Sequence, residues 1–313
     1  LYLDVKMKEE ITVGFGGNVS SHQANQLYLG LGYQYLGRFA ADVNSNFQVG
    51  NSFSGVMLSG RMYLQTQIPT YLNWQGVFSD KKYTESQSLF YEDIVPAMIK
   101  QKELYMKLKL GFPFLNHAKA EIGFAYGRLN DFYLQSTTIP FPNASFDHSW
   151  YDLFSGSLSI EQNSLNTKQY PISGKQQFLI AQYVTGTEKY TPSPTSATTE
   201  APIGRKVHSW LQLKGRWNQY QTLSNRFNLG YLAEMVISSK NLMNNYTASV
   251  LQAPAFTPTP HSEIVFNEAF RANQYVAFGL SPILKLSKLL HFRLDMYGFA
   301  PLLSLIHISE PTR

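Results

Sequence analysis

Residues 104–112 read LYMKLKLGF, and this stretch decides the fold predicted for the chain. Its apolar residues recur at every second position, with Lys107, Lys109 and Gly111 between them. Successive side chains of a β-strand point to opposite faces of the sheet, so the pattern predicts a strand with one apolar and one polar face.

The same alternation returns in thirteen segments, and their apolar positions hold no charged residue. The segments are 11–19, 27–35, 39–47, 56–64, 72–78, 104–112, 120–126, 154–160, 178–184, 211–217, 227–237, 276–286 and 290–296. A tilted strand of ~9–11 residues crosses a bilayer. The sequence therefore predicts an all-β protein, an antiparallel transmembrane β-barrel with its apolar face toward lipid.

Charged residues of these segments fall on the opposite face. They include Asp42, Arg61, Lys107, Lys109, Glu121, Lys214, Arg216, Glu234, Arg293 and Asp295, together with Lys119 just before the 120–126 segment. A Lys or Arg that faces lipid at mid-membrane costs ~2–4 kcal/mol, so a membrane barrel requires this sorting. The alternative is a soluble β-sandwich or lipocalin-like barrel, which would bury the apolar set inside.

Composition also favours strands in a membrane. The 313 residues include 21 Phe, 20 Tyr and 4 Trp, and only 15% are charged. Yet no stretch reaches the ~18–20 consecutive apolar residues of a spanning helix, which leaves a closed barrel. The net charge of +5 is scattered rather than clustered, which argues against a nucleic-acid partner. The absence of Cys excludes disulfides and thiol chemistry.

The predicted connections alternate in length. Short ones fall at 36–38, 113–118 and 222–225, and long ones at 81–101, 130–149, 188–206 and 240–272. Short periplasmic turns opposite long external loops are typical of outer-membrane barrels. The segment TPSPTSATTEAPIG at 191–204 is too poor in apolar residues to pack, so we expect an external loop there.

Catalytic and metal-binding patterns are missing from the sequence. No Gly-x-Ser-x-Gly motif occurs; GNSFSG at 50–55 and FSGSLSI at 154–160 lack the second glycine at the required offset. The seven histidines are dispersed, and none pairs at the spacing of metal ligands. We therefore expect no enzyme activity, metal or cofactor in this chain.

One loop holds candidate functional residues. The long connection before the 276–286 segment ends in Phe270, Arg271, Ala272 and Asn273. An arginine on a loop folded into the barrel would need an acidic partner, which Asp295 or Glu234 could supply. Alternatively, Arg271 belongs to an exposed loop and faces water.

Several stretches resemble one protein family. VGFGGNVSS (13–21), LYLGLGYQYLGRF (27–39), NNYTASVLQAPAFTP (244–258) and FRANQYVAFGL (270–280) look like the C-terminal barrel of bacterial patatin-like phospholipases, within the insertase and two-partner-secretion superfamily of surface-antigen barrels. The resemblance implies sixteen strands, of which about thirteen are present. It implies that residues 1–10 are the last strand of a periplasmic POTRA-like module and 11–303 the incomplete barrel. Residues 304–313 resemble a translated sequencing adapter, a non-native tail.

The resemblance also bears on the loop residues. The superfamily's sixth loop carries a Val-Arg-Gly-Phe/Tyr motif held against an acidic residue of strand thirteen. Arg271 matches the arginine and Asp295 the acid, while Phe270, Ala272 and Asn273 depart from the motif.

The function that the resemblance implies is that of an outer-membrane module, which anchors or helps translocate an attached patatin-like phospholipase domain. The catalytic Ser–Asp dyad of patatins is not among these residues. The implied partners are outer-membrane lipids, the outer-membrane assembly machinery, and N-terminal patatin and POTRA domains. Two alternatives are an outer-membrane transport or protein-translocation pore, and an enzyme embedded in the barrel. Entry of the 240–272 loop into the interior would argue against an open pore.

Overall fold

The computed structural model of the chain describes residues 10–18, 25–50, 53–85, 97–115, 117–133, 145–194, 204–259, 262, 266–287 and 290–303. The predicted POTRA-like strand, except Glu10, and the predicted tail at 304–313 lie outside these ranges, as does most of the 191–204 segment. Among the helices of these ranges, none is long and apolar enough to span a membrane.

Fourteen strands form one antiparallel sheet, in which each strand from β1 to β12 pairs with the next, while β13 and β14 both pair with β12. The strands are β1 (Ile11–Asn18), β2 (Gln26–Leu36), β3 (Ala40–Gly50), β4 (Phe53–Leu64), β5 (Thr70–Glu85), β6 (Ala97–Phe114), β7 (Ala118–Tyr133), β8 (Asp147–Asn163), β9 (Gly174–Thr191), β10 (Gly204–Thr222), β11 (Phe227–Ser238), β12 (Gln274–Lys285), β13 (His291–Arg293) and β14 (Met296–Leu303). Two short helices, α1 (Tyr246–Leu251) and the 3-10 turn Glu268–Phe270, lie between β11 and β12.

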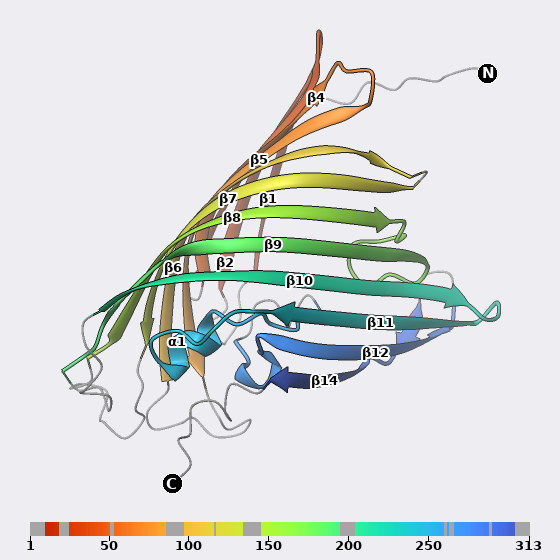
Figure 1. The fold of residues 1–313 in the computed structure, drawn as a ribbon. Helices are drawn as coiled ribbons and strands as arrows, with labels where there is room; N and C mark the ends of the chain where they lie inside the picture. Colours follow the sequence, from red (N-terminus) through yellow and green to blue (C-terminus); the bar gives the residue numbers. More distant parts are fainter. Residues whose placement is uncertain are drawn as a thin grey trace.

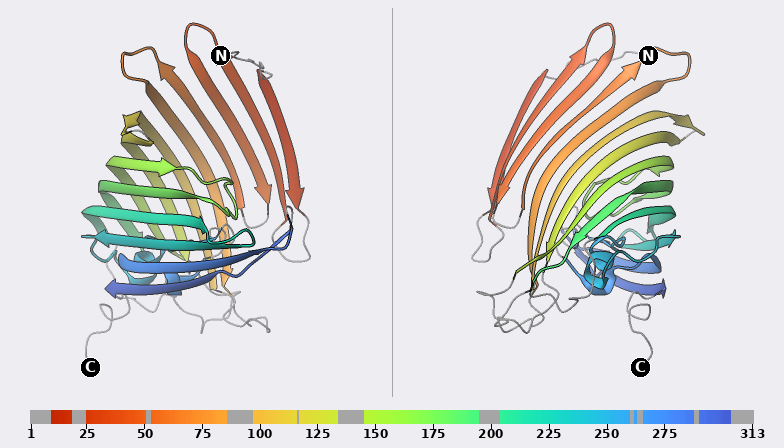
Figure 2. Two further views of the ribbon diagram at one scale, coloured as in Figure 1. Left: turned by 90° about the vertical axis from the view of Figure 1, so that its right-hand side faces the viewer. Right: turned by 60° about the vertical axis from the view of Figure 1, so that its left-hand side comes forward.

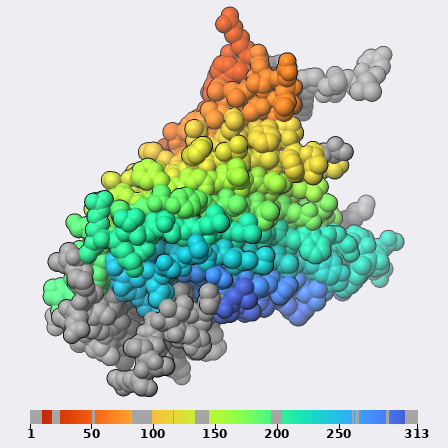
Figure 3. All heavy atoms as spheres, viewed as in Figure 1, coloured from red at the N-terminus to blue at the C-terminus, as the bar shows by residue number. Residues whose placement is uncertain are grey.

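The sheet curls into a barrel wall, as predicted. Figure 1 shows β8–β12 in front and β1 and β2 behind them, and Figure 3 shows consecutive strands as adjacent bands of one surface. Figure 2 shows β1 and β14 at the two borders of the sheet. Within the described residues β1 pairs only with β2, so the sheet has two edges.

The two faces of the wall differ as the alternation requires. Outward apolar side chains are exposed, for example Met106 at 53% and Leu108 at 46%. Lys109, which lies between Leu108 and Leu110, points inward, and its ammonium lies 2.6 Å from the carboxylate of Glu121. The convex face is therefore apolar and the concave face ionic, which confirms the predicted orientation and contradicts the soluble alternative with an apolar interior.

Glu121 of β7 is the centre of an interior polar cluster. Its carboxylate, only 5% exposed, accepts a hydrogen bond of 2.7 Å from the hydroxyl of Tyr71. It also lies 3.4 Å from Lys119, which in turn pairs with Glu161 at 3.0 Å. A partly buried carboxylate needs such partners, because its transfer from water is otherwise costly.

The structure corrects the predicted strand lengths. Strands β5–β10 have 16–19 residues, more than the ~9–11 that cross a bilayer. The long connections shrink accordingly to 86–96, 134–146 and 192–203. The prediction followed apolar residues, whereas these strands continue through polar residues such as Lys100 and Lys102 after the apolar band ends.

The thirteenth segment is also corrected. It was predicted as a single strand at 290–296, but it divides into β13 and β14, with Leu294 and Asp295 between them. The carboxylate of Asp295 accepts hydrogen bonds from Ser281 at 2.5 Å and from Arg293 at 2.7 Å. These side-chain bonds hold the interruption against β12.

We predict that Glu121→Gln lowers the free energy of unfolding by about 2–3 kcal/mol, because Lys109 loses its charged partner and Tyr71 its charged acceptor. The matched control is Glu161→Gln, in a more exposed pair, with an expected loss below about 1 kcal/mol. Urea titration of the folded protein in detergent measures both. Equal losses would contradict a special role for the cluster around Glu121.

Candidate functional site

The connection between β11 and β12, residues 239–273, forms the candidate site. It contains α1, which begins after Asn245, whose side-chain oxygen accepts a 2.7 Å hydrogen bond from the amide of Ala248. Figure 1 shows α1 beside β10 and β11 at one end of the wall. Ala248, Ser249, Val250 and Leu251 of this helix are buried, although a six-residue helix has little stability alone. Contacts with the wall therefore fix this loop.

The first group of contacts is apolar. Met243, Ala248 and Leu251 of the loop belong to one buried cluster with inward side chains of five strands, β6–β10. The wall residues of this cluster are Ile99, Tyr133, Tyr151, Val184 and Trp210. The loop thus completes a hydrophobic core on the concave face, where most inward residues are polar.

Two fully buried carboxylates of the wall receive polar groups of the loop. Asp131 of β7 accepts a 2.8 Å hydrogen bond from the side chain of Gln252. Glu188 of β9 accepts 3.2 Å bonds from the amide of Asn244 and lies 2.7 Å from Nε2 of His208. Such charge-assisted bonds contribute more than neutral ones, and a buried carboxylate without them would be destabilising.

Sequence reasoning missed both carboxylates. Asp131 and Glu188 fall inside the predicted loops at 130–149 and 188–206, so neither was placed on a wall strand. The structure puts them in β7 and β9 with side chains inward. A signal was available, because each continues the period-two positions of its strand, as Leu129 and Gly127 precede Asp131.

A second apolar cluster holds the later part of the loop. The ring of Phe256 packs against Tyr275, Tyr297 and Phe299 at centroid distances of 6.0–6.3 Å. The hydroxyl of Tyr275 donates a 3.3 Å hydrogen bond to the carbonyl of Ala255. This part of the loop is therefore bound to β12 and β14.

Glu234, one of the two acids predicted to partner Arg271, lies beside this cluster. Its buried carboxylate accepts a 2.5 Å hydrogen bond from Tyr275 and pairs with Lys214 at 3.1 Å and with Arg216. Arg216 also donates to the carbonyl of Thr257 at 3.4 Å. Glu234 therefore contacts the loop indirectly, through Tyr275 and Arg216.

Arg271 itself braces the loop from within. One terminal nitrogen, Nη1, donates to the carbonyls of Leu251 at 3.0 Å and Ala253 at 3.3 Å. Its guanidinium lies 4.6 Å from the ring centroid of Phe266 and interacts electrostatically with Asp131. Arg271 is therefore half-buried and bonded to its own loop.

The neighbours of Arg271 are also in contact. Ala272 is buried and its amide donates to the carbonyl of Pro254, while the side chain of Asn273 donates to the carbonyl of Lys240 at 3.2 Å. The ring of Phe270 lies 5.7 Å from that of Phe299. Asp295, the other predicted acid, is engaged by Arg293 and Ser281, so its pairing with Arg271 remains a prediction.

Lys240 begins the loop and carries a perturbed amine. Its ammonium donates 2.5 Å to the carbonyl of Gln252 and lies 4.7 Å from the ring centroid of Trp210. Burial lowers the pKa of Lys240 to about 7, against the opposing attraction of Glu188 and Asp131. A released loop would hold this proton up to pH 10 or so, so raising the pH above 7 favours the docked loop.

A polar cavity of about 330 Å³ remains beside the loop. It lies between Thr257–Thr259 of the loop and the turn at 164–173, which folds toward Arg293. Arg293 donates to the carbonyl of Pro171 and to the hydroxyl of Tyr220, both at 2.9 Å. The loop and this turn therefore narrow the interior from opposite ends.

The described residues show no grouping of three or more His, Cys, Asp or Glu able to hold a metal ion. His208 pairs with Glu188 in the docking contacts, and His148 stacks on Phe132 at 4.3 Å. The contacts described at this site are hydrogen bonds, ion pairs and ring contacts.

Comparison with known proteins places the fold. No protein-family model and no curated protein matches the sequence. Among solved structures, one match is the crystal structure of BamA from Haemophilus ducreyi lacking POTRA domains 1–3, with a TM-score of 0.63 and 12% sequence identity. The match covers 95% of this chain and 59% of that chain, so this chain spans about three fifths of the solved protein. The fold is a BamA-like barrel.

We predict that Arg271→Ala weakens folding, because the carbonyls of Leu251 and Ala253 lose a charged donor. The expected loss is about 2–3 kcal/mol. The fraction of protein that keeps its folded gel mobility on heating measures it. Arg271→Lys keeps the charge but not the planar fork and should give an intermediate loss. Unchanged heat resistance in Arg271→Ala would show that the arginine does not support the loop.

Proposed function

We propose that this chain is the membrane-embedded module of a bacterial outer-membrane protein, with its convex face in lipid. The observation that carries the proposal is the exposed apolar side chains around a wall whose inner face is ionic. In water this arrangement would leave a large apolar surface exposed, which monomeric soluble proteins avoid. In a bilayer the same surface is buried, and strand pairing satisfies the backbone.

The work proposed for the module is to anchor, or help translocate, an attached patatin-like phospholipase domain. The sequence resemblance at 13–39 and 244–280 supports the patatin parent, and the BamA-like fold is compatible with the same superfamily of insertase and secretion barrels. Residues 1–10 would then connect to a POTRA-like module, and catalysis would lie outside this chain. Outer-membrane lipids and the assembly machinery would be its partners.

Closure of the barrel by further strands is part of the proposal. The described residues leave β1 and the β12–β14 side as separate edges. Unpaired backbone groups cost several kcal/mol each in lipid, so an edge within the bilayer needs a partner strand. Because β13 and β14 share one position beside β12, the described sheet has thirteen strand positions, and three additional strands would make the proposed sixteen.

A transport or translocation pore is the second candidate, favoured by the polar interior. Against an open pore stands the loop 239–273, which is bound to β6–β12 by two apolar clusters and the carboxylates Asp131 and Glu188. The proposed role of the loop is therefore to brace and obstruct the interior. A pore that conducts only when the loop leaves is compatible with this geometry.

The membrane location is tested by a charge on the convex face. Leu158, which is 60% exposed, should cost ~2–4 kcal/mol when changed to Lys if it faces lipid near the midplane. The control is Gln182→Lys, on the neighbouring strand with its side chain inward, where little change is expected. Reversible folding into phospholipid vesicles measures both. A neutral Leu158→Lys variant, or a chain that is monomeric without detergent, would contradict the proposal.

Conductance separates the brace from the open pore. We expect small or unstable currents for the unmodified chain in a planar bilayer, and large steady currents when residues 245–258 are replaced by a Gly/Ser linker. Openings should become rarer from pH 7 to 9 because deprotonation of Lys240 favours docking, and Lys240→Met should remove this dependence. Steady large currents without any substitution would favour a diffusion pore instead.

A further inference from the structure

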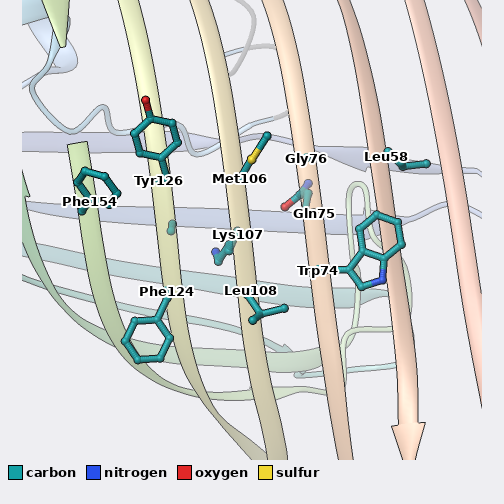
Figure 4. A pocket seen from close by; sticks show the side chains of 11 residues that line it. Leu58, Trp74, Gln75, Gly76, Met106, Lys107, Leu108, Phe124, Tyr126 and Phe154 are labelled. Carbon is teal, nitrogen blue, oxygen red and sulfur yellow. The ribbon is translucent and has the colours of Figure 1, made fainter. Parts of the chain in front are cut away.

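The convex face has a hollow of about 520 Å³ over β4–β8. Its lining includes outward apolar side chains of all five strands, shown in Figure 4: Leu58, Trp74, Met106, Leu108, Phe124 and Phe154. Gly76 lies in register between Leu58 and Met106, and a Cβ at Gly76 would meet no atom within 4 Å. The hollow therefore exists because Gly76 has no side chain, while the outward residues around it are large.

Outward residues change from apolar to basic just beyond the hollow, toward the long loops. Arg128 lies two residues past Tyr126 of the lining, and Lys102 lies two residues past Leu104. Arg128 is in register with Leu104, so Arg128 and Lys102 are diagonal neighbours on adjacent strands. Two cations consequently stand together at the rim of an apolar hollow.

Arg128 is already oriented for binding at this rim. Its Nε donates to Asp152 at 2.8 Å, and its guanidinium lies 5.4 Å from the ring centroid of Trp150. The hydroxyl of Tyr126 donates to the same carboxylate at 2.8 Å. The side chain of Arg128 is still 44% exposed, so its remaining N–H groups are accessible from the surface.

The cationic character extends along the same rim. Lys100, Lys189 and Arg205 also occupy outward positions there. In the strand register Lys100 lies opposite Phe132, Lys189 opposite the outward Trp150, and Arg205 opposite Lys189. In the part of the chain that the structure describes, no carboxylate pairs with Lys102, Lys189 or Arg205, while Lys100 pairs with Asp80 at 3.8 Å. The rim therefore carries a net positive charge.

The opposite end of the convex face is different. At the ends of β8–β10 near the short turns, the outward positions hold Gln162, Gln177 and Gln219, with Lys175 as a single cation. A general need for solubility would not distribute charge so unevenly. The cations gather at one membrane boundary, next to the hollow.

We propose that this surface binds an anionic lipid, with its phosphate against Arg128 and Lys102 and an acyl chain in the hollow over Gly76. The inference rests on the proposed function, because it requires the convex face to lie in a bilayer. A phosphate gains charge-assisted hydrogen bonds from the guanidinium, and the chain buries apolar surface that a flat wall would not offer. The two cations thus select a lipid by its headgroup charge, and the hollow adds affinity for its acyl chain.

Competition between two lipids tests the proposal. The purified protein in neutral detergent receives an equal mixture of phosphatidylglycerol and phosphatidylcholine, and native mass spectrometry counts the lipid retained. We expect phosphatidylglycerol to be retained about fivefold over phosphatidylcholine. Lys102→Gln with Arg128→Gln should bring this ratio close to one. The matched control Lys175→Gln, which removes an outward cation at the other end, should leave it unchanged.

Filling the hollow tests the acyl-chain half. Gly76→Leu adds a side chain at a position where a Cβ would meet no atom within 4 Å, so we expect folding to persist while retention of both lipids falls several-fold. Gly76→Ala fills less of the hollow, so it should reduce lipid retention less than Gly76→Leu does. Heat-resistant gel mobility verifies folding of each variant.

Three outcomes would overturn the inference: no preference in the unmodified protein, an equal effect of Lys175→Gln, or full lipid retention by Gly76→Leu. Failure of the proposed function is distinguishable from these. A protein that does not enter vesicles contradicts the membrane location, whereas one that enters them without lipid preference contradicts only this site.

Discussion

The rest of the structure depends on one constraint, the alternation of side chains along every strand of a single continuous sheet. Because neighbouring strands are in register, the inward residues of each strand meet the inward residues of the next, as Lys109 meets Glu121 through β6 and β7. A shift of one residue would exchange the faces and put these charges among Leu108 and Phe124. Ion pairing inside and apolar exposure outside are thus consequences of the same register.

The interior of this wall would be a weak core without the loop 239–273. Inward residues are mostly polar, and polar groups contribute to folding only when they find partners. The loop supplies both kinds of contact, with Met243 and Leu251 filling an apolar cluster and Asn244 and Gln252 satisfying Glu188 and Asp131. The loop packs as a second layer against the concave face of the sheet. This is why several of its residues, such as Met243 and Leu251, are buried.

The sequence predicted the strands of the wall better than the side chains and the loop that fill the interior. Period-two alternation located all thirteen apolar segments, because lipid or solvent exposure on one face leaves a direct mark on residue type. It did not reveal the extensions of β5–β10, where the pattern is reversed: apolar side chains such as Ile99, Tyr133 and Tyr151 face inward, while basic ones such as Lys100 and Lys102 face outward. Asp131 and Glu188 lie in those extensions and were missed for this reason.

The docking of the loop was only partly predictable. The position of Arg271 before β12 suggested an interior ion pair, but its terminal nitrogen Nη1 donates to the backbone carbonyls of Leu251 and Ala253. Backbone carbonyls leave no signature in residue type, whereas an acidic partner does, so sequence reasoning turned to Asp295 and Glu234. Glu234 is held by cations of the neighbouring strand β10, and Asp295 by Arg293 two residues before it, so neither acid depends on the loop for its cation.

The interior support is uneven around the wall, and this follows from where the loop can reach. Every buried side chain in the described residues belongs to β5 or to a later part of the chain, while the inward faces of β2 and β3 present polar side chains that are not fully buried, such as Gln26, Asp42 and Asn46. The strands β1–β4 are therefore held by backbone pairing and a few side-chain hydrogen bonds, such as Tyr28 to Asn46, whereas β6–β12 are also held by contacts with the loop 239–273. Local opening requires the least free energy where buried contacts are fewest, so we expect the edge at β1 to open more readily than β6–β12, which the loop 239–273 holds from inside.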